Sequence, residues 1–241
     1  MGVRLTVVGC SPAWPNPGGA QSGYLVEGPG RLLLDCGPGV LGRLRADTAW
    51  PSVDAIAITH FHLDHWGDLV PWVWGAMAGP GAGLDPPELH VPPGGRRTLA
   101  ELAQQLGGFP DMFERTFRLA EYEPGITSEI AGFKVLPVRM RHYLMGSYGF
   151  RVSNGDSVLA YSGDAAPCDE LVELARDSNI FLCEATLEEL EDEPRGHLLL
   201  EEAEAAFRAS GAKRLLVTHR PDERPVRDGI ELAYDGLVVE V

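Results

Sequence analysis

The chain has 241 residues and a formal net charge of −15, from 20 basic and 35 acidic side chains. Such a negative field disfavours a long polyanion such as RNA or DNA as the ligand and favours a small substrate. The four cysteines form no Cys-x-x-Cys pair, no apolar run reaches the roughly 18 residues of a membrane span, and no charged-then-apolar leader is visible. We therefore expect a soluble, cytoplasmic protein with reduced thiols and neither a zinc ribbon nor a disulfide framework.

The first half of the chain alternates short apolar runs with turn residues. This pattern predicts strands over Val3–Val8, Tyr24–Glu27, Arg31–Asp35, Val53–Ile58 and Glu88–Val91, and helices from Gly39 through Arg45, over Leu69–Met77 and over Arg97–Leu106. The Pro/Gly-rich stretch 11–19 is predicted to be a loop. The apolar helix that contains Trp72 and Trp74 is predicted to belong to the core, with a wall of the substrate cleft as the alternative.

The second half continues in the same way. Predicted strands cover Phe133–Met140, Tyr148–Ser153, Val158–Tyr161, Ile180–Cys183 and Arg214–Val217, and predicted helices cover Cys168–Arg176 and Leu199–Ala209. The run Ala-Ile-Thr-His at 57–60 is echoed by Leu-Val-Thr-His at 216–219, so two apolar strands each deliver Thr-His at their carboxyl end. The echo is too short to prove an internal repeat.

Ligand-type side chains are concentrated in residues 59–68, directly after the apolar run that ends at Ile58. The segment reads Thr-His-Phe-His-Leu-Asp-His-Trp-Gly-Asp. The spacing His-x-His-x-Asp-His lets a loop turn His60 and His62 toward one metal ion while Asp64 and His65 face a second. Neutral imidazole and carboxylate are ligands of Zn²⁺ and similar divalent ions. The alternative is a surface loop that is rich in histidine by chance.

This loop after a strand resembles the signature of the metallo-β-lactamase superfamily. The resemblance implies an α/β fold, a four-layer αββα sandwich with a dinuclear metal site at the edge of its two sheets. It also implies one fused domain over residues 1–241, with similar halves of approximately 1–125 and 126–241. In that family an aspartate at the position of Asp35 supports the histidine loop from behind the ligands, whereas an ordinary turn or helix-capping residue is the alternative.

The resemblance also implies a complete set of metal ligands. His60, His62 and His142 would surround one ion, Asp64, His65 and His219 the other, and Asp164 would bridge the two. Alone, a histidine such as His142 is more often a core or surface residue, but the order of these pieces along the chain matches the family. We expect two divalent ions, Zn²⁺ with Mn²⁺ or Fe²⁺ as alternatives. His90 has no ligand-type neighbour and is predicted to be structural or exposed.

Within the superfamily, the chain is similar to the ribonuclease Z-like branch, which includes cyclic nucleotide phosphodiesterases. The matching pieces are Asp-Cys-Gly-Pro-Gly at 35–39, the histidine loop, His142 with Tyr-Gly-Phe at 148–150, Ser-Gly-Asp at 162–164, Glu-Ala-Thr at 184–186 with Gly-His at 196–197, Thr-His at 218–219 and Ala-Tyr-Asp-Gly at 233–236. The resemblance implies that Glu184 orients His197 and that His197 protonates the leaving oxygen. Together with Asp64, these are the predicted catalytic residues. The alternative is that Glu184 is only a strand-end carboxylate and that His197 only precedes a helix.

Two departures and one absence separate this chain from tRNA-processing members. Arg-Pro-Asp-Glu-Arg follows His219 instead of Phe-Ser-x-Arg, the threonine two places after His197 is missing, and no long basic Gly/Pro arm lies between residues 75 and 130. We therefore predict a phosphodiesterase for a small phosphodiester such as a cyclic nucleotide, acting as a homodimer. The alternatives are a ribonuclease Z-type endonuclease on RNA, and a non-phosphoester metallohydrolase or biosynthetic protein on the same fold.

Overall fold

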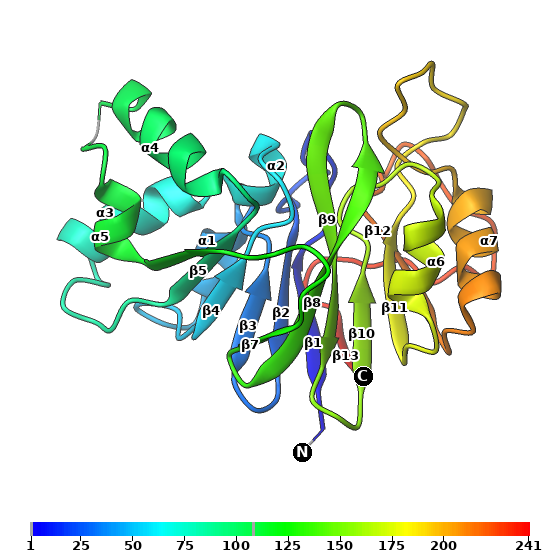
Figure 1. Cartoon of the computed structure of the whole chain (residues 1–241), viewed down its shortest axis with the longest axis horizontal. Helices are drawn as coiled ribbons and strands as arrows, with labels where there is room; N and C mark the ends of the chain where they lie inside the picture. Colours follow the sequence, from blue (N-terminus) through cyan, green and yellow to red (C-terminus); the bar gives the residue numbers. More distant parts are fainter. Residues whose placement is uncertain (1, 108) are drawn as a thin grey trace.

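The structure, a computed structural model, describes residues 2–107 and 109–241. Two mixed β-sheets pack face to face, and helices cover the outer side of each sheet (Figure 1). The first sheet has the order β13-β1-β2-β3-β4-β5-β6. Its strands are β1 (Arg4–Gly9), β2 (Gly23–Glu27), β3 (Arg31–Leu34), β4 (Ala55–Ala57), β5 (Glu88–Val91), β6 (Arg118–Glu121) and β13 (Val238–Glu240).

The second sheet has the order β12-β11-β10-β9-β8-β7. Its strands are β7 (Ser128–Ile130), β8 (Phe133–His142), β9 (Met145–Ser153), β10 (Val158–Tyr161), β11 (Ile180–Glu184) and β12 (Leu215–Thr218). The helices are α1 (Val40–Leu44), α2 (Leu63–Trp66), α3 (Leu69–Ala78), α4 (Gly95–Gln105), α5 (Met112–Thr116), α6 (Asp169–Ala175) and α7 (Leu200–Ser210). Among the described residues, no helix is long and apolar enough to cross a membrane.

Three layers of apolar side chains hold the four layers of secondary structure together. Leu34 and Phe150 belong to the core between the sheets. Trp72 of α3 and Phe113 of α5 pack on the outer face of the first sheet, and Phe181 packs beneath α6 and α7 on the second. Because parallel strands with helices on one side and a sheet on the other are buried on both faces, they are apolar without alternation. The predicted αββα sandwich is confirmed.

The sheet topology brings the predicted ligands to one edge. β3, β4 and β5 are parallel neighbours in the first sheet, and β10, β11 and β12 are parallel neighbours in the second. Parallel neighbours end at the same edge of a sheet, so the segments that follow β4, β10, β11 and β12 meet there. β8 ends at His142, and this end of the strand reaches the same edge.

The structure adds elements that the sequence pattern did not predict: β6, β7, β13, α2 and α5. Each is short, and β7 and β13 bury only one side chain each, so they carry almost no periodic signal. β13 pairs with β1 in the first sheet, and Val239 lies opposite Leu5. In the sequence, however, β13 belongs to the second half of the chain. The division of the domain into two similar halves near residue 125 therefore stays a prediction. β13 departs from it, because this strand joins the sheet formed by the first half.

Candidate metal centre

The histidine loop is shaped by a helix of one turn. His60 follows β4, and α2 begins after His62, which is its N-cap residue. His60, Asp64 and His65 are buried, whereas Leu63 is 62% exposed. The turn of helix thus directs the ligand-type side chains inward and leaves the leucine between them facing solvent.

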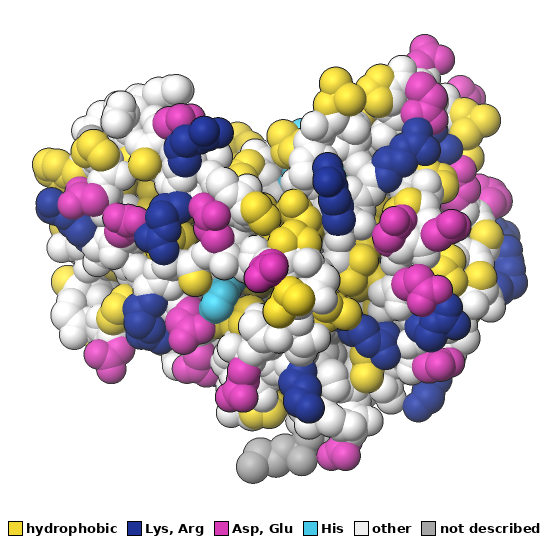
Figure 2. Space-filling view, in the orientation of Figure 1, with side chains coloured by type: hydrophobic (Ala, Val, Ile, Leu, Met, Phe, Trp, Pro, Cys, Tyr) yellow, Lys and Arg dark blue, Asp and Glu magenta, His cyan; other side chains and the backbone are white. Residues whose placement is uncertain are grey.

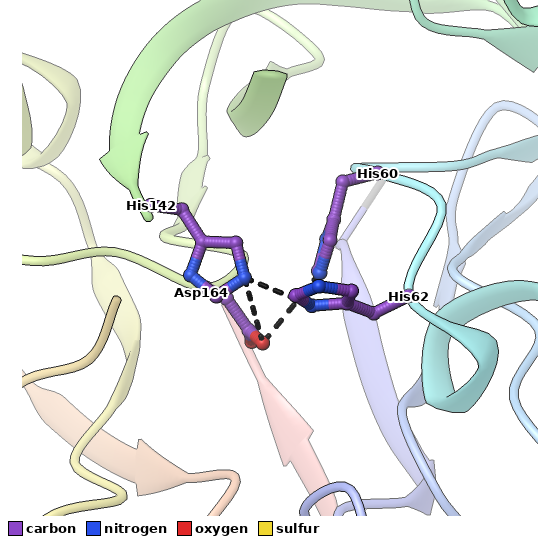
Figure 3. Close-up of side chains that lie close together, drawn as sticks. All are labelled: His60, His62, His142 and Asp164. Atoms are coloured by element: carbon purple, nitrogen blue, oxygen red, sulfur yellow. Dashed lines mark hydrogen bonds and ion pairs between the residues drawn. The ribbon is translucent and has the colours of Figure 1, made fainter. Parts of the chain in front are cut away.

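A first group of side chains comes from three separate segments. His60, His62, His142 and Asp164 offer ligand atoms that all lie within 4.8 Å of one another (Figure 3). His62 Nδ1 is 3.0 Å from His142 Nε2, and His60 Nε2 is 3.7 Å from Asp164 Oδ2. Three imidazoles and a carboxylate therefore converge on one point.

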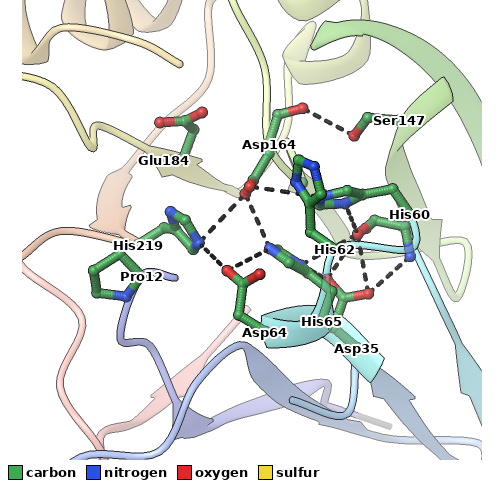
Figure 4. Close-up of polar contacts among 12 residues, drawn as sticks. Pro12, Asp35, His60, His62, Asp64, His65, Ser147, Asp164, Glu184 and His219 are labelled. Atoms are coloured by element: carbon green, nitrogen blue, oxygen red, sulfur yellow. Dashed lines mark hydrogen bonds and ion pairs between the residues drawn. The ribbon is translucent and has the colours of Figure 1, made fainter. Parts of the chain in front are cut away.

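A second group shares the same carboxylate. Asp64, His65, His219 and Asp164 also lie within 4.8 Å of one another, and all four are buried (Figure 4). His219 Nε2 is 3.0 Å from Asp64 Oδ2, and His65 Nε2 is 3.3 Å from Asp164 Oδ1. The structure therefore brings together all seven predicted ligands, in the two groups that the resemblance implied, with Asp164 common to both.

The position of Asp164 depends on the residue before it. Gly163 has φ of 58°, and a Cβ at this position would lie 2.8 Å from the carbonyl oxygen of Tyr148. A side chain there would be strained and would collide with backbone, so glycine allows the chain to turn after β10. The turn aims the Asp164 carboxylate between the histidines.

Unpartnered polar atoms test whether divalent ions fit these groups. Within the described residues, the buried atoms that lack a hydrogen-bond partner include His60 Nε2, His65 Nε2 and Asp164 Oδ1. Buried polar atoms in proteins are nearly always hydrogen-bonded, so three orphans in one place need an explanation. All three point into the two groups, and nitrogen and carboxylate oxygen are suitable donors for Zn²⁺ and similar ions. The His/Asp clusters are thus suited to binding metal ions.

The electrostatics of the groups keep most ligands in the form that binds a metal. Burial lowers the pKa values of His60, His62 and His142, which favours neutral imidazole. Burial of Asp164 acts to raise its pKa, but His219 and His65 outweigh burial and hold the pKa well below its usual value. His65 differs, because Asp164 and Asp35 raise its pKa despite burial.

Hydrogen bonds behind the ligands fix three of the imidazoles. His142 Nδ1 donates to the carbonyl oxygen of Gly196 at 2.6 Å, and His65 Nδ1 donates to Asp35 Oδ2 at 2.7 Å. The hydroxyl of Thr186 lies 2.9 Å from His219 Nδ1 and 2.8 Å from Glu184 Oε2, which fits an acceptor toward the imidazole and a donor toward the carboxylate. In each case Nε2 is left with its lone pair toward the centre, as metal-binding histidines require.

Asp35 supports the histidine loop as the resemblance implied. It is fully buried with φ of 60°, and it accepts hydrogen bonds from the Thr59 N–H at 2.7 Å and from the Tyr161 hydroxyl at 2.8 Å, besides the one from His65. The helix-capping alternative is wrong, because α1 begins later, after Gly39. Two supporting residues were not predicted from the sequence: Thr59 and Thr186, whose hydroxyls contact the imidazoles of His60 and His219.

Replacing Asp35 by Asn should weaken metal binding about 10- to 100-fold, because the amide cannot accept all of these hydrogen bonds and His65 loses its orientation. Competition with a chromophoric chelator measures the affinity. Asp68→Asn is the matched control, because Asp68 accepts a hydrogen bond from the Leu41 N–H at 2.7 Å and has no contact with a ligand. Equal affinities of the two variants would contradict the role of Asp35.

A glutamate and a histidine form a hydrogen-bonded pair beside the two ligand groups. Glu184 is fully buried at the end of β11, and its Oε1 accepts hydrogen bonds from His197 Nδ1 and from the Ala165 N–H, both at 2.9 Å. The His197 ring stacks on His219 with centroids 5.6 Å apart. Burial alone lowers the pKa of His197, but Glu184 outweighs it and raises the pKa to about 9. The predicted pair is formed, and Glu184, His197 and His219 also constitute a third group of close ligand-type atoms.

His90 lies outside the metal centre, as predicted, and the prediction that the apolar helix belongs to the core holds in part. His90 lies on β5, where its Nε2 contacts Glu88 Oε2 at 2.8 Å, away from the centre. Trp72 is buried in the core under α3, whereas Trp74 is 46% exposed. Neither feature adds to the metal centre.

A four-layer sandwich with clustered histidines and aspartates at the shared edge of its sheets defines the class of metallo-hydrolases with the metallo-beta-lactamase fold. Residues 30–220 match the family described as beta-lactamase superfamily domain. The chain therefore belongs to the beta-lactamase superfamily.

Similar sequences cover nearly the whole chain. An uncharacterized protein of Mycobacterium leprae is 34% identical, over 98% of this chain and 85% of its own length. The probable metallo-hydrolase YhfI of Bacillus subtilis is 27% identical over 91% of this chain and 87% of its own. A ribonuclease Z of Myxococcus xanthus is 26% identical over 99% and 98%.

Solved structures show the same fold. The crystal structure of YhfI superposes with a TM-score of 0.85 over all of both chains, at 22% identity. A diphosphatase from the PhnP family superposes with a TM-score of 0.73 over 100% of this chain and 98% of its own, also at 22% identity. Zn²⁺-bound PqqB from Methylobacterium extorquens has a TM-score of 0.78 over 99% of this chain and 100% of its own, at 15% identity.

Proposed function

We propose that this metallo-hydrolase is a dinuclear phosphodiesterase that acts on a small phosphodiester, with a cyclic nucleotide as the leading candidate. One observation carries the proposal: Asp164 is shared by two ligand groups, and the Glu184–His197 pair lies beside it, with His197 Nδ1 4.0 Å from Asp164 Oδ2. The arrangement offers two adjacent metal positions and one proton donor. We propose Zn²⁺ for both positions, with Mn²⁺ or Fe²⁺ as alternatives for an all-nitrogen and oxygen site. The solved structure of PqqB, which has the same fold, is Zn²⁺-bound.

Two bound divalent ions would supply charge stabilisation for an in-line displacement at phosphorus and an activated water at neutral pH. The protein supplies the remaining chemistry. Glu184 holds His197 through Nδ1, which leaves Nε2 to carry a proton toward a leaving oxygen, and the raised pKa keeps that proton on the ring near neutral pH. Asp64, a predicted ligand that also contacts His219, keeps the second group aligned.

Chemistry at phosphorus is favoured by the relatives, since the names ribonuclease Z and diphosphatase both denote enzymes that cleave a bond to phosphorus. A small substrate is favoured over RNA by the net charge of −15. The region between α3 and β6 supports the same choice, because α4 and α5 fold back onto the first sheet through Leu99, Ala103 and Phe113. This segment is therefore part of the domain and does not extend as an arm.

A substrate panel tests the proposal: cyclic AMP, bis(p-nitrophenyl) phosphate, a lactone, a thioester and a pre-tRNA, each incubated with the Zn²⁺-loaded protein. We expect turnover of the two phosphodiesters and none of the lactone or thioester. Cleavage of pre-tRNA with no activity on the small diesters would favour the endonuclease instead. The homodimer expected from the sequence stays a prediction, which light scattering of the purified protein tests.

Salt dependence separates a small substrate from a polyanion. A substrate with one phosphate engaged should lose no more than about 4-fold in kcat/KM between roughly 50 and 200 mM salt, whereas a nucleic acid with 6–10 contacts loses about 10³–10⁵-fold in affinity. Initial rates on bis(p-nitrophenyl) phosphate measure the first quantity. Tight binding of tRNA at physiological salt would reverse the preference for a small substrate.

A further inference from the structure

An aromatic residue in an unusual conformation follows the ligand His142. Tyr143 lies in the turn between β8 and β9 with φ of 44°, in the left-handed region. A bulky side chain rarely adopts this conformation, and such outliers collect at functional sites. The backbone at Tyr143 is therefore strained, and its ring lies beside the metal centre.

Three contacts hold the ring in place. The Tyr143 hydroxyl donates to Glu191 Oε1 at 2.6 Å, and its backbone N–H donates to the Arg195 carbonyl oxygen at 3.0 Å. The ring also lies against Gly196, where an added Cβ would stand 2.1 Å from Tyr143 Cε2. Any side chain at position 196 would collide with the Tyr143 ring, so glycine at this position allows the segment between β11 and α7 to pack against the ring.

The ring lies between the first ligand group and the proposed acid. Its centroid is 4.8 Å from that of His142, 5.6 Å from that of His197 and 6.4 Å from that of His62. The hydroxyl is occupied by its hydrogen bond to Glu191 Oε1. The part of Tyr143 left to a substrate is therefore its ring, and 36% of the residue as a whole is exposed.

The surface around the ring is hollowed, and it carries exposed apolar side chains beside charged ones. Leu144 is 92% exposed and Met145 37% exposed, and hydrophobic side chains gather at the top of the molecule on either side of a notch (Figure 2). Leu63, between two ligands of the histidine loop, adds another exposed apolar group. A cavity of about 490 Å³ runs along the turn, and its lining includes Arg139, Arg141, Tyr143, Leu144, Met145 and Glu170. This volume is in the range of sites for small organic ligands.

We propose that Tyr143 determines specificity by stacking on a planar ring in the alcohol part of the phosphoester, as in a nucleoside. The inference rests on the proposed phosphodiesterase function, and it identifies the planar ring as the part of the substrate that Tyr143 contacts. A base has an aromatic face and stacks on an aromatic side chain without a sequence-specific hydrogen bond. A ring fixed at both its hydroxyl and its backbone loses little freedom when it stacks, which favours binding.

Binding of two phosphates that differ only in the base tests the inference. Adenosine 5′-monophosphate and ribose 5-phosphate are titrated by calorimetry into the Zn²⁺-loaded wild type, Tyr143→Phe and Tyr143→Leu. Stacking should make the wild type prefer the nucleotide by about 10-fold or more. Tyr143→Phe should retain the preference, and Tyr143→Leu, which keeps apolar bulk without a ring, should bring the ratio close to one.

The outcomes separate this inference from the function on which it rests. Equal affinities of the wild type for both phosphates, or an unchanged preference in Tyr143→Leu, would overturn the stacking role and leave the phosphodiesterase intact. If Tyr143→Leu weakens both phosphates equally, the residue only supports the segment around Gly196, and the inference fails. Binding of neither phosphate by the wild type would likewise overturn the stacking role, whereas failure of the proposed function shows separately, as no turnover of bis(p-nitrophenyl) phosphate by the same protein. Circular dichroism and zinc content verify each variant, and Tyr143→Met replaces the leucine variant if that one does not fold.

Discussion

Replacing Asp164 by Ala should reduce the metal content from close to two ions per chain to close to one, and should lower kcat on bis(p-nitrophenyl) phosphate by about 10³-fold. The reason is that Asp164 belongs to both ligand groups. Its carboxylate oxygens lie 3.3 Å from His65, 3.6 Å from His219 and 3.7 Å from His60. Loss of several kcal/mol of charge stabilisation corresponds to this rate factor.

Elemental analysis of dialysed protein and initial rates measure the two effects. Asp156→Ala is the control, because Asp156 is an exposed carboxylate in the turn between β9 and β10. It should leave both the ion count and the rate unchanged. An Asp164 variant that keeps two ions, or a wild type that holds no metal after growth with zinc, would exclude the dinuclear assignment.

The ligands could be predicted because each one follows a strand or lies in a turn that the sequence marks. His60, Asp164 and His219 stand directly after apolar runs, and parallel neighbours in each sheet must end at the same edge. The pairing of the two groups, however, came from the resemblance to a family. Nothing in the spacing alone assigns His142 to the group of His60 rather than to that of His219.

The supporting residues were harder to predict because their partners lie far away in the chain. Both Thr-His pairs have the same sequence, yet the Thr59 hydroxyl contacts His60 Nδ1 at 3.0 Å, whereas the Thr218 hydroxyl contacts Tyr24 at 2.6 Å. The imidazole of His219 is held by Thr186 instead. The repeated dipeptide thus indicates similar strands and does not indicate similar hydrogen bonds.

Tyr143 illustrates the same limit. Its sequence neighbours indicate only a turn after a strand. Its proposed role depends on a positive φ and on contacts with Glu191 and Gly196, which lie about 50 residues further along the chain. Contacts between a turn and a distant loop leave no periodic signal in a single sequence.

Replacing His197 by Ala should lower kcat on an alkyl diester such as cyclic AMP by roughly 10²–10⁴-fold, with a much smaller loss on bis(p-nitrophenyl) phosphate. A ribose alkoxide needs a proton as its P–O bond breaks, whereas p-nitrophenolate leaves without one. His197 is positioned to give that proton, since Glu184 holds its Nδ1 at 2.9 Å and the ring stacks on His219 at the centre. Metal content should stay the same, because His197 is outside both predicted ligand groups.

His90→Ala is the matched histidine control, because His90 pairs with Glu88 on β5 and should affect neither substrate. Glu184→Gln gives a second, independent comparison: it should reproduce the dependence on the leaving group in weaker form, since the amide still positions the ring but no longer raises its pKa. Equal losses on both substrates in the His197 variant would rule out an acid that acts on the leaving group. Loss of an ion in that variant would instead make His197 a ligand with Glu184 and His219, the third group of close donor atoms at this edge.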